Sequence, residues 1–294
     1  MRALITGGAG FVGAHLRAHL ETLGDEVIVT DLEVDITDAH AIAKVVASTA
    51  PNAIYHLAAM SHVGESWDTP STVLSVNVIG TANVLAAARR AEVERVLITS
   101  SADVYGAVTK EQLPLTEDAA LAPANPYAAS KAAAEIIALQ AWRSFEQGVI
   151  IARPFNHIGP GQSPRFAVAG LAARLVEAKR TGAGTLSVGN LAARRDFTDV
   201  RDIVTGYRTL IETGTPGEIY NLCSGHDVSL AEIVERLQVV VGTHVELTTD
   251  PELLRPLDTP VLRGDASKIH DALGWRPTID LAQSLSDIVA EFER

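Results

Sequence analysis

The chain has 294 residues, enough for one large or two modest domains, and its 47% hydrophobic content supplies a sizeable core. The formal net charge of −12 argues against a nucleic-acid partner, because nucleic acids are generally bound through a basic surface. Cys223 is the only cysteine, which excludes an internal disulfide, and the scattered histidines argue against a metal site. No apolar run approaches the roughly 18 residues that span a bilayer. We therefore expect a cytoplasmic protein without a membrane partner.

A strand, a glycine-rich turn and a helix are predicted over residues 1–15. Gly7, Gly10 and Gly13 permit a tight turn, close approach of the backbone to a pyrophosphate, and close packing of the helix on the strand. The helix after the turn would point its unpaired N–H groups at the phosphates. This arrangement predicts a dinucleotide-binding site at the start of the chain.

Residues 26–31 form a second apolar strand, which ends in Asp31. A carboxylate at this position accepts hydrogen bonds from an adenosine ribose and repels the 2′-phosphate of NADP. No arginine follows Asp31 before Lys44 to offset that repulsion. The sequence therefore favours NAD(H), with NADP(H) as the alternative.

Strands alternate with helices through the first half of the chain. After Asp31 we expect a helix at about 37–48, a strand at 53–58, a helix at 77–91, a strand at 95–101, a helix at 126–145 that begins with proline, and a strand at 149–152. This alternation is typical of an α/β fold with a Rossmann-like, doubly wound parallel sheet. Ligands bind such sheets at the carboxyl ends of the strands.

The pattern changes after residue 153. We expect helices at about 164–180, 201–213, 229–241 and 280–292, and short strands at 186–189 and 218–223. These elements predict a dinucleotide-binding domain over residues 1–153 and a smaller α/β substrate-binding domain over 154–294. About 196–224 of the second part is expected to fold back onto the sheet. Cys223, at the end of a strand-like run, is expected to be buried and inert.

Tyr127 and Lys131 are four residues apart on the long predicted helix, so both side chains lie on one face, about a turn apart. A tyrosine that gives a proton to a developing alkoxide needs a lowered pKa, and a nearby ammonium favours the phenolate. Lys131 can also hold a nicotinamide ribose. Ser101 ends a neighbouring strand, where its hydroxyl can hydrogen-bond the same substrate oxygen.

In this order the three features resemble the short-chain dehydrogenase/reductase family, in its extended branch that acts on nucleotide sugars. The resemblance is carried by Thr6-Gly-Gly-Ala-Gly-Phe-Val-Gly13, His56-Leu-Ala-Ala59, Asn77, Ser100-Ser-Ala-Asp-Val-Tyr-Gly106 and Tyr127-Ala-Ala-Ser-Lys131. It implies a catalytic hydroxyl at Ser101, an acid/base at Tyr127 and its cationic helper at Lys131. The cofactor contacts that it implies are Gly7, Gly10, Phe11, Val12, Gly13, Asp31, Asp35, Ile36, Leu57, Ala58, Ala59, Asn77, Tyr127, Lys131 and Pro154.

Substrate-binding residues are expected from both halves of the chain. Arg195 and Arg255 suit a diphosphate, because a planar guanidinium can bind two oxygens at once. The resemblance implies that these arginines hold the diphosphate, that Asp258 meets the ribose and that Asn156 also contacts the diphosphate. The other substrate contacts that it implies are Ser61, Val63, Ser101, Ala102, Asp103 and Val188. The adjacent His157 is expected to be a neutral histidine packed in its loop.

Three runs, 153–162, 188–202 and 253–260, are similar to those of bacterial GDP-4-keto-6-deoxy-D-mannose reductases. The similarity implies reduction of the C4 ketone to give GDP-D-rhamnose, and the guanine rests on this similarity alone. Asp103 departs from the glutamate that is common in this group. A 4,6-dehydratase, a 4-epimerase that retains its NAD, and a non-enzymatic nucleotide sensor stay open as alternatives. The dehydratase would need an acid for the C6 hydroxyl, which Ala102 cannot supply.

Alanines are frequent on the predicted helices at 77–91 and 127–142. They exceed what a helix needs to cover a sheet on one side, and small side chains permit close contact between helices. In the extended family the equivalent helices pair across a two-fold axis. The resemblance therefore implies a homodimer assembled through a four-helix bundle.

Overall fold

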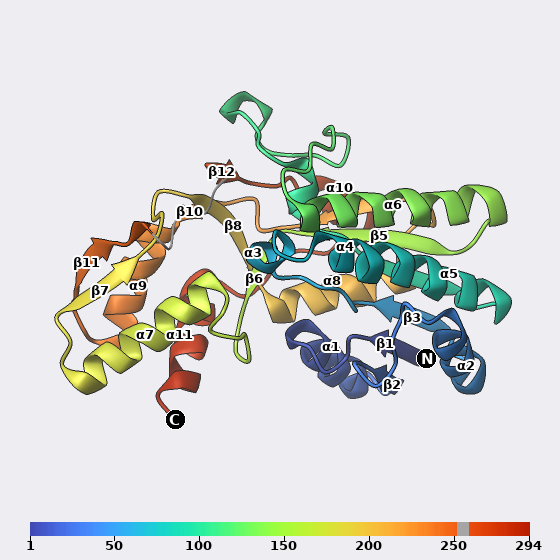
Figure 1. Ribbon diagram of the computed structural model, residues 1–294, viewed down its shortest axis with the longest axis horizontal. Coiled ribbons are helices and arrows are strands. Elements are labelled where there is room, and N and C mark those ends of the chain that lie inside the picture. Colours follow the sequence, from blue (N-terminus) through green and yellow to red (C-terminus); the bar gives the residue numbers. More distant parts are fainter. Residues whose placement is uncertain (252–258) are drawn as a thin grey trace.

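The computed structural model describes residues 1–251 and 259–294 (Figure 1). Its main layer is a six-stranded sheet of order β2-β1-β3-β4-β5-β9, in which every neighbouring pair is parallel. Its strands are β1 Arg2–Thr6, β2 Glu26–Thr30, β3 Ala53–His56, β4 Arg95–Thr99, β5 Val149–Pro154 and β9 Ile219–Leu222. The strand order reverses between β1 and β3, which is the point where ligands bind such sheets.

Helices cover both faces of this sheet, so its central strands β3 and β5 are buried along their whole length. One face carries α1 (Phe11–Thr22), α8 (Val200–Thr213) and α10 (Ser267–Leu273). The other face carries α2 (Ala39–Thr49), α5 (Gly80–Arg90) and α6 (Pro126–Phe145). The predicted doubly wound parallel sheet is confirmed.

Helix α6 has the predicted bounds because its ends are marked in the sequence. Pro126 occupies the first turn, where a missing backbone N–H costs nothing, and the Asn125 side chain accepts a hydrogen bond of 2.8 Å from the Ala128 amide. At the other end Glu146 adopts a left-handed conformation with φ 53°. The helix therefore starts and stops where local chemistry favours it.

The helical run before β4 begins earlier than predicted. It consists of α4 (Pro70–Leu74), a π-helical turn η1 (Ser75–Ile79) and α5, so the predicted start at residue 77 is wrong. Pro70 in the first turn is the start signal that the alanine-rich pattern concealed. The continuous run Pro70–Arg90 is also long and apolar enough to cross a membrane by length and composition, although no such run was expected. Its most apolar window is 44% buried, and core helices pass the same test.

Strand β4 ends at Thr99, so the predicted strand to residue 101 is too long. Ser101 instead precedes a short 3₁₀ helix, η2 (Ala102–Tyr105), and its hydroxyl accepts a hydrogen bond of 3.2 Å from the Asp103 amide. A serine favours such a cap because its side chain competes for backbone N–H groups. The chain therefore leaves the sheet just before Ser101. The side chain of Ser101 lies at the carboxyl edge of the sheet.

A second group of elements lies beside the sheet and has its own apolar core (Figure 1). Its helices are α7 (Ala167–Thr181), α9 (Leu230–Val241) and α11 (Leu281–Phe292), which match the predicted helices within a few residues. Its strands are β6 Asn156–Ile158, β7 Thr185–Val188, β8 Arg194–Asp199, β10 Asp227–Ser229, β11 Glu246–Thr249 and β12 Val261–Leu262. Of these the sequence predicted only β7, because the others are short, or polar like β8, and lack clear alternation.

Part of the second half returns to the main sheet. Strand β9 pairs with β5 in parallel, and α8 packs against α1. Cys223 follows β9 and is fully buried, and this burial raises the pKa of its thiol well above the ordinary value. The expectation of a buried cysteine is confirmed.

A buried ion pair joins α6 to β5. Arg153 Nε and Nη2 donate to the two carboxylate oxygens of Glu135 at 2.8 and 2.7 Å, and both side chains are almost fully buried. Ser100 donates to the same carboxylate, and Arg153 Nη1 donates to the Tyr105 hydroxyl at 3.0 Å. Glu135 lies one turn after Lys131. The pair therefore fixes the helix that carries Tyr127 against the end of β5, and the Ser100 contact ties it to the segment after β4.

Candidate active site

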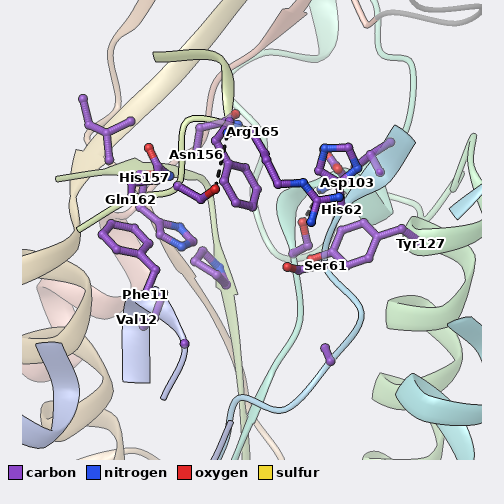
Figure 2. A pocket seen from close by; sticks show the side chains of 18 of the residues that line it. Phe11, Val12, Ser61, His62, Asp103, Tyr127, Asn156, His157, Gln162 and Arg165 are labelled. Atoms are coloured by element: carbon purple, nitrogen blue, oxygen red, sulfur yellow. Dashed lines mark hydrogen bonds between the residues drawn. The ribbon is translucent and has the colours of Figure 1, made fainter. Parts of the chain in front are cut away.

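A cavity opens at the carboxyl ends of β1, β3, β4 and β5, where the fold predicts a ligand. Figure 2 shows residues from both halves of the chain around it. Phe11 and Val12 lie on one side, and Tyr127 and Asp103 lie on another. The second half adds Asn156, His157, Gln162 and Arg165.

The glycine-rich turn between β1 and α1 leaves room for a pyrophosphate. Gly7 has φ +72°, and a Cβ there would lie 2.7 Å from the Ala58 amide nitrogen. A Cβ on Gly13 would lie 2.5 Å from the Gly7 carbonyl oxygen, so the first turn of α1 packs directly on the loop. Gly10 precedes α1, whose first N–H groups have no side-chain cap. These residues fit a dinucleotide, with the phosphates at the start of α1.

Asp31 braces this turn from the end of β2. Its carboxylate accepts hydrogen bonds from the Ala9 amide at 2.8 Å and the Leu32 amide at 2.9 Å. Asp31 and Asp35 both line the cavity. The described lysines and arginines that line the cavity come from α6 or from the second half of the chain: Lys131, Arg165, Arg174 and Arg195. The described aspartates of the lining, Asp31, Asp35 and Asp103, come from the first half of the chain, as does Lys131, whereas the described arginines come from the second half.

A buried histidine supports the floor between β1 and β3. The Thr81 hydroxyl donates to the Asn77 carbonyl oxygen at 2.7 Å, so it must accept from His56 Nε2 at 3.0 Å. His56 Nδ1 is then the acceptor for the Thr6 hydroxyl at 2.7 Å. Burial, with a smaller effect from Lys131, lowers the pKa of His56 to about 3. His56 is therefore neutral and holds one tautomer.

Asn77 lies outside the described lining of the cavity and is 2% exposed, and the expected cofactor contact stays a prediction. Its side chain accepts from the Met60 amide at 2.8 Å and donates to the Met60 carbonyl at 3.1 Å and the Ser130 hydroxyl at 2.8 Å. Asn77 thus holds the backbone of Met60, which lines the cavity. The other predicted cofactor residues do line it: Gly7, Gly10, Phe11, Val12, Gly13, Asp31, Asp35, Ile36, Leu57, Ala58, Ala59, Tyr127, Lys131 and Pro154.

Tyr127 and Ser101 meet at the carboxyl edge of β4. Burial, followed by the charge of Asp103, raises the pKa of Tyr127 above its ordinary value, and a hydrogen bond with Ser101 opposes this effect. We expected the ammonium of Lys131 to lower this pKa. Instead, Lys131 Nζ donates to the Thr99 carbonyl oxygen at 2.7 Å. The phenol is therefore protonated at neutral pH, in the form that can give a proton.

Lys131 itself is buried. Removal from water lowers the pKa of its ammonium to about 8, and the neighbouring Glu135 carboxylate opposes this effect. The ammonium is therefore the main form at pH 7 and is lost on moderate alkalinisation.

The second half of the chain supplies the opposite wall of the cavity. Arg195 lines it, and its Nη1 donates to the carbonyl oxygens of Arg194 at 2.8 Å and Thr259 at 2.6 Å. The structure also brings the other described substrate candidates to the lining: Ser61, Val63, Ser101, Ala102, Asp103, Asn156 and Val188. Arg255 and Asp258 lie outside the described residues.

Several polar lining residues escaped the sequence analysis, among them His62, Arg165 and Arg174. They belong to no recognisable motif, and only the loop at 61–66 was expected near a ligand. His157 is stacked on Phe11, with ring centroids 6.2 Å apart and planes 8° from parallel. Burial lowers the pKa of His157, which confirms the expected neutral form.

The parallel sheet, the glycine turn and the Tyr127/Lys131 helix define a nicotinamide-dependent enzyme of the extended short-chain dehydrogenase/reductase type. Residues 30–288 match the model of the family described as GDP-mannose 4,6 dehydratase, and the chain belongs to this family.

Relatives with several activities are similar over the whole chain. GDP-6-deoxy-D-mannose reductase of Pseudomonas aeruginosa is 36% identical, covering 99% of this chain and 97% of that protein. UDP-glucose 4-epimerase of Mycolicibacterium smegmatis is 32% identical, and the match covers 99% of this chain and 98% of that protein. The solved structure of RMD from Pseudomonas aeruginosa complexed with NADPH has a TM-score of 0.92 and 35% identity, covering 99% of this chain and 98% of that one. UDP-glucose 4-epimerase of Thermus thermophilus in complex with NAD has a TM-score of 0.91 and 27% identity, covering 99% of each chain.

The pKa of Lys131 gives a prediction about cofactor affinity. If Lys131 holds the nicotinamide ribose, affinity for NADH should fall by roughly tenfold as its ammonium is lost above about pH 8, since hydrogen bonds to charged groups are worth about 1.5–3 kcal/mol. Fluorescence titration of NADH between about pH 6.5 and 9.5 measures this. Lys131→Met should bind weakly with little pH dependence over that range. A flat profile for the wild type would contradict the assignment.

The position of Asp31 predicts a preference for NADH. Its charge should reduce the specificity constant for NADPH by on the order of tenfold, because like charges about 4 Å apart repel by roughly 1–4 kcal/mol. Asp31→Asn should narrow the difference between the specificity constants for NADH and NADPH, and it keeps an oxygen that can accept from the Ala9 amide. Asp35→Asn removes another carboxylate of the lining, and it should leave the ratio of the two specificity constants closer to the wild-type ratio than Asp31→Asn does. A higher kcat/KM for wild type with NADPH would overturn this prediction, and a related structure does contain NADPH.

Proposed function

We propose that the enzyme reduces the C4 ketone of GDP-4-keto-6-deoxy-D-mannose to give GDP-D-rhamnose, with NADH as the favoured cofactor. The proposal rests chiefly on the position of the buried Tyr127 phenol beside Ser101 in the cavity, one helical turn from Lys131. A reductase needs its acid in the protonated form before hydride transfer. The similarity to GDP-6-deoxy-D-mannose reductase supports the choice of sugar and base.

The residues at the carboxyl edge of β4 can complete the reduction. The reduced nicotinamide, when bound, supplies the hydride that C4 receives. Tyr127 gives its phenolic proton to the C4 oxygen as negative charge develops there, and the Ser101 hydroxyl donates a hydrogen bond to the same oxygen. Lys131 holds the nicotinamide ribose and lies one turn along the helix from Tyr127. C4 thus gains the hydride, and the C4 oxygen gains the proton.

The substrate would lie between the two halves of the chain. Arg195 would bind the diphosphate from a position fixed by two carbonyl oxygens, with Asn156 beside it and Arg255 and Asp258 completing the site. The sugar would reach Tyr127 past Ser61, Val63, Ala102, Asp103 and Val188. We divide the chain into a dinucleotide-binding domain at 1–153 and a substrate-binding domain at 154–294, with about 196–224 returning to the sheet. We place the enzyme in the cytoplasm.

The dehydratase and the epimerase are the alternatives within this family. A dehydratase needs both a base for the C5 proton and an acid for the C6 hydroxyl. Asp103 lies in the cavity and could serve as one of them, but the adjacent Ala102 has no proton to exchange. This missing group favours the reductase over the dehydratase. An epimerase would recycle its nicotinamide and so show no net consumption of NADH.

Two substitutions separate these reactions. For a reductase, Tyr127→Phe should lower turnover by about 10² to 10⁴-fold, the usual value of a positioned proton transfer, whereas Asp103→Asn should do much less. NADH absorbance with GDP-4-keto-6-deoxy-D-mannose measures this. A second assay gives each protein GDP-mannose alone. If wild type converts GDP-mannose to the 4-keto sugar and leaves NADH untouched with the keto sugar, the reductase assignment is wrong.

We also propose a homodimer through a four-helix bundle. Leu74, Ile79 and Ile136 are large apolar residues that are 45%, 52% and 64% exposed, and they lie on segments that pack side by side, α4, η1 and α6. Exposed apolar side chains that gather on neighbouring helices mark an interaction surface. The many alanines of the same helices allow another helix to approach closely.

A charge on this surface should dissociate the dimer. Ile136→Glu would bury an unpaired carboxylate between the subunits, so we expect monomers at micromolar concentration, measured by light scattering. Val239→Glu is the matched control, because Val239 is 81% exposed on α9 in the other group of elements. A monomeric wild type under the same conditions would refute the dimer.

A further inference from the structure

Two contacts cross the cavity from one half of the chain to the other. Arg165, in the loop before α7, forms an ion pair with Glu65 of α3 (Val63–Ser66). The next residue, Phe166, packs edge-on against the ring of His62, with centroids 6.0 Å apart. Figure 2 shows the Arg165 side chain extending through the cavity toward His62. A cation from the substrate-binding half thus reaches the wall formed by the first half.

The Arg165–Glu65 ion pair is poorly suited to hold the two walls together. The two side chains are 60% and 47% exposed, and pairs of this kind contribute little stability because water screens the charges. Arg195 differs, since backbone carbonyl oxygens at 2.8 and 2.6 Å hold its guanidinium. Arg165 can therefore exchange its carboxylate partner for another anion at low cost, whereas Arg195 is fixed in advance.

The surroundings of Arg165 indicate which anion it would take. Arg165, Arg174 and Arg195 all line the cavity from the second half of the chain. A guanidinium that binds a carboxylate offers the same paired N–H donors to a phosphate. A group with two phosphates would satisfy more than one of these arginines.

We infer that Arg165 is a further binding residue for the diphosphate of the substrate, and that Glu65 competes with the substrate for it. The inference rests on the proposed function, from which it takes a nucleoside diphosphate sugar as the ligand. Without substrate, Arg165 pairs with Glu65. The diphosphate displaces the carboxylate and takes over the guanidinium. Glu65 therefore weakens the binding of ligands whose phosphate must displace it from Arg165, and it does not affect ligands that make no contact with Arg165.

The competition predicts opposite effects for the two partners. Removing the competitor, Glu65→Gln, should lower the dissociation constant for inorganic pyrophosphate and for GDP by roughly 2- to 5-fold, the value of an exposed ion pair. Removing the cation, Arg165→Gln, should raise both constants by about tenfold. The double variant should behave like Arg165→Gln, because Glu65 acts only through Arg165. Isothermal titration calorimetry measures all of these constants.

A second ion pair gives matched controls. Glu177 and Arg180 form an exposed pair on α7 that does not belong to the described cavity lining, so Glu177→Gln and Arg180→Gln should bind pyrophosphate like wild type. The difference between the dissociation constants of Glu65→Gln and wild type for pyrophosphate should also shrink at high salt, because salt screens the Arg165–Glu65 pair.

Two results would overturn the inference. If Glu65→Gln and Arg165→Gln both raise the dissociation constant, the pair is a brace that closes the cavity. If neither changes it, Arg165 does not bind the anion. Failure of the proposed reductase would be seen separately, as a wild type that oxidises no NADH with the keto sugar. In that case the pyrophosphate series still decides the role of Arg165.

Discussion

The buried ion pair between Glu135 and Arg153 is the interaction on which the site depends. Taking two charges out of water costs free energy that their attraction and hydrogen bonds only partly restore, so such a pair is a poor source of stability. The role of the pair here is to position helix α6 relative to strand β5. Tyr127, Lys131 and Glu135 follow one face of α6, and Arg153 holds that face at the end of β5. Tyr105 supports the guanidinium from the segment that follows Ser101. One bidentate contact thus fixes the helix, the strand and the serine relative to one another.

The sequence predicted those features that depend on the residue types of a short segment. Pro126 marked the start of α6, and the four-residue spacing of Tyr127 and Lys131 placed both side chains on one face. Where tertiary contacts decide, the sequence misled. Nothing local shows that the chain leaves the sheet before Ser101, or that the buried amide of Asn77 holds the backbone of Met60. Arg165 reaches the cavity only because the two halves of the chain pack together, which no short-range pattern records.

The cavity contains both buried groups that stay uncharged and charged groups that line it. Burial without a cationic partner keeps the phenol of Tyr127 protonated, and burial without an anionic partner keeps His56 neutral. Neither group needs to change its charge to receive a ligand. Among the described lining residues, the aspartates and Lys131 come from the first half of the chain and the arginines come from the second half. An asymmetric ligand would therefore meet a field that distinguishes its two ends.

The return of the chain to the main sheet has a consequence for biosynthesis. Strand β9 pairs with β5, and α8 packs on α1, although the elements of each pair lie far apart in the sequence. A ribosome that has released only the first half leaves β5 as an open edge and α1 without its neighbour. Unpaired edges and uncovered apolar faces are what chaperones bind and what aggregates form from. The sheet is complete only when Leu222 has emerged, so β5 lacks its neighbour and α1 lacks α8 until that point of translation.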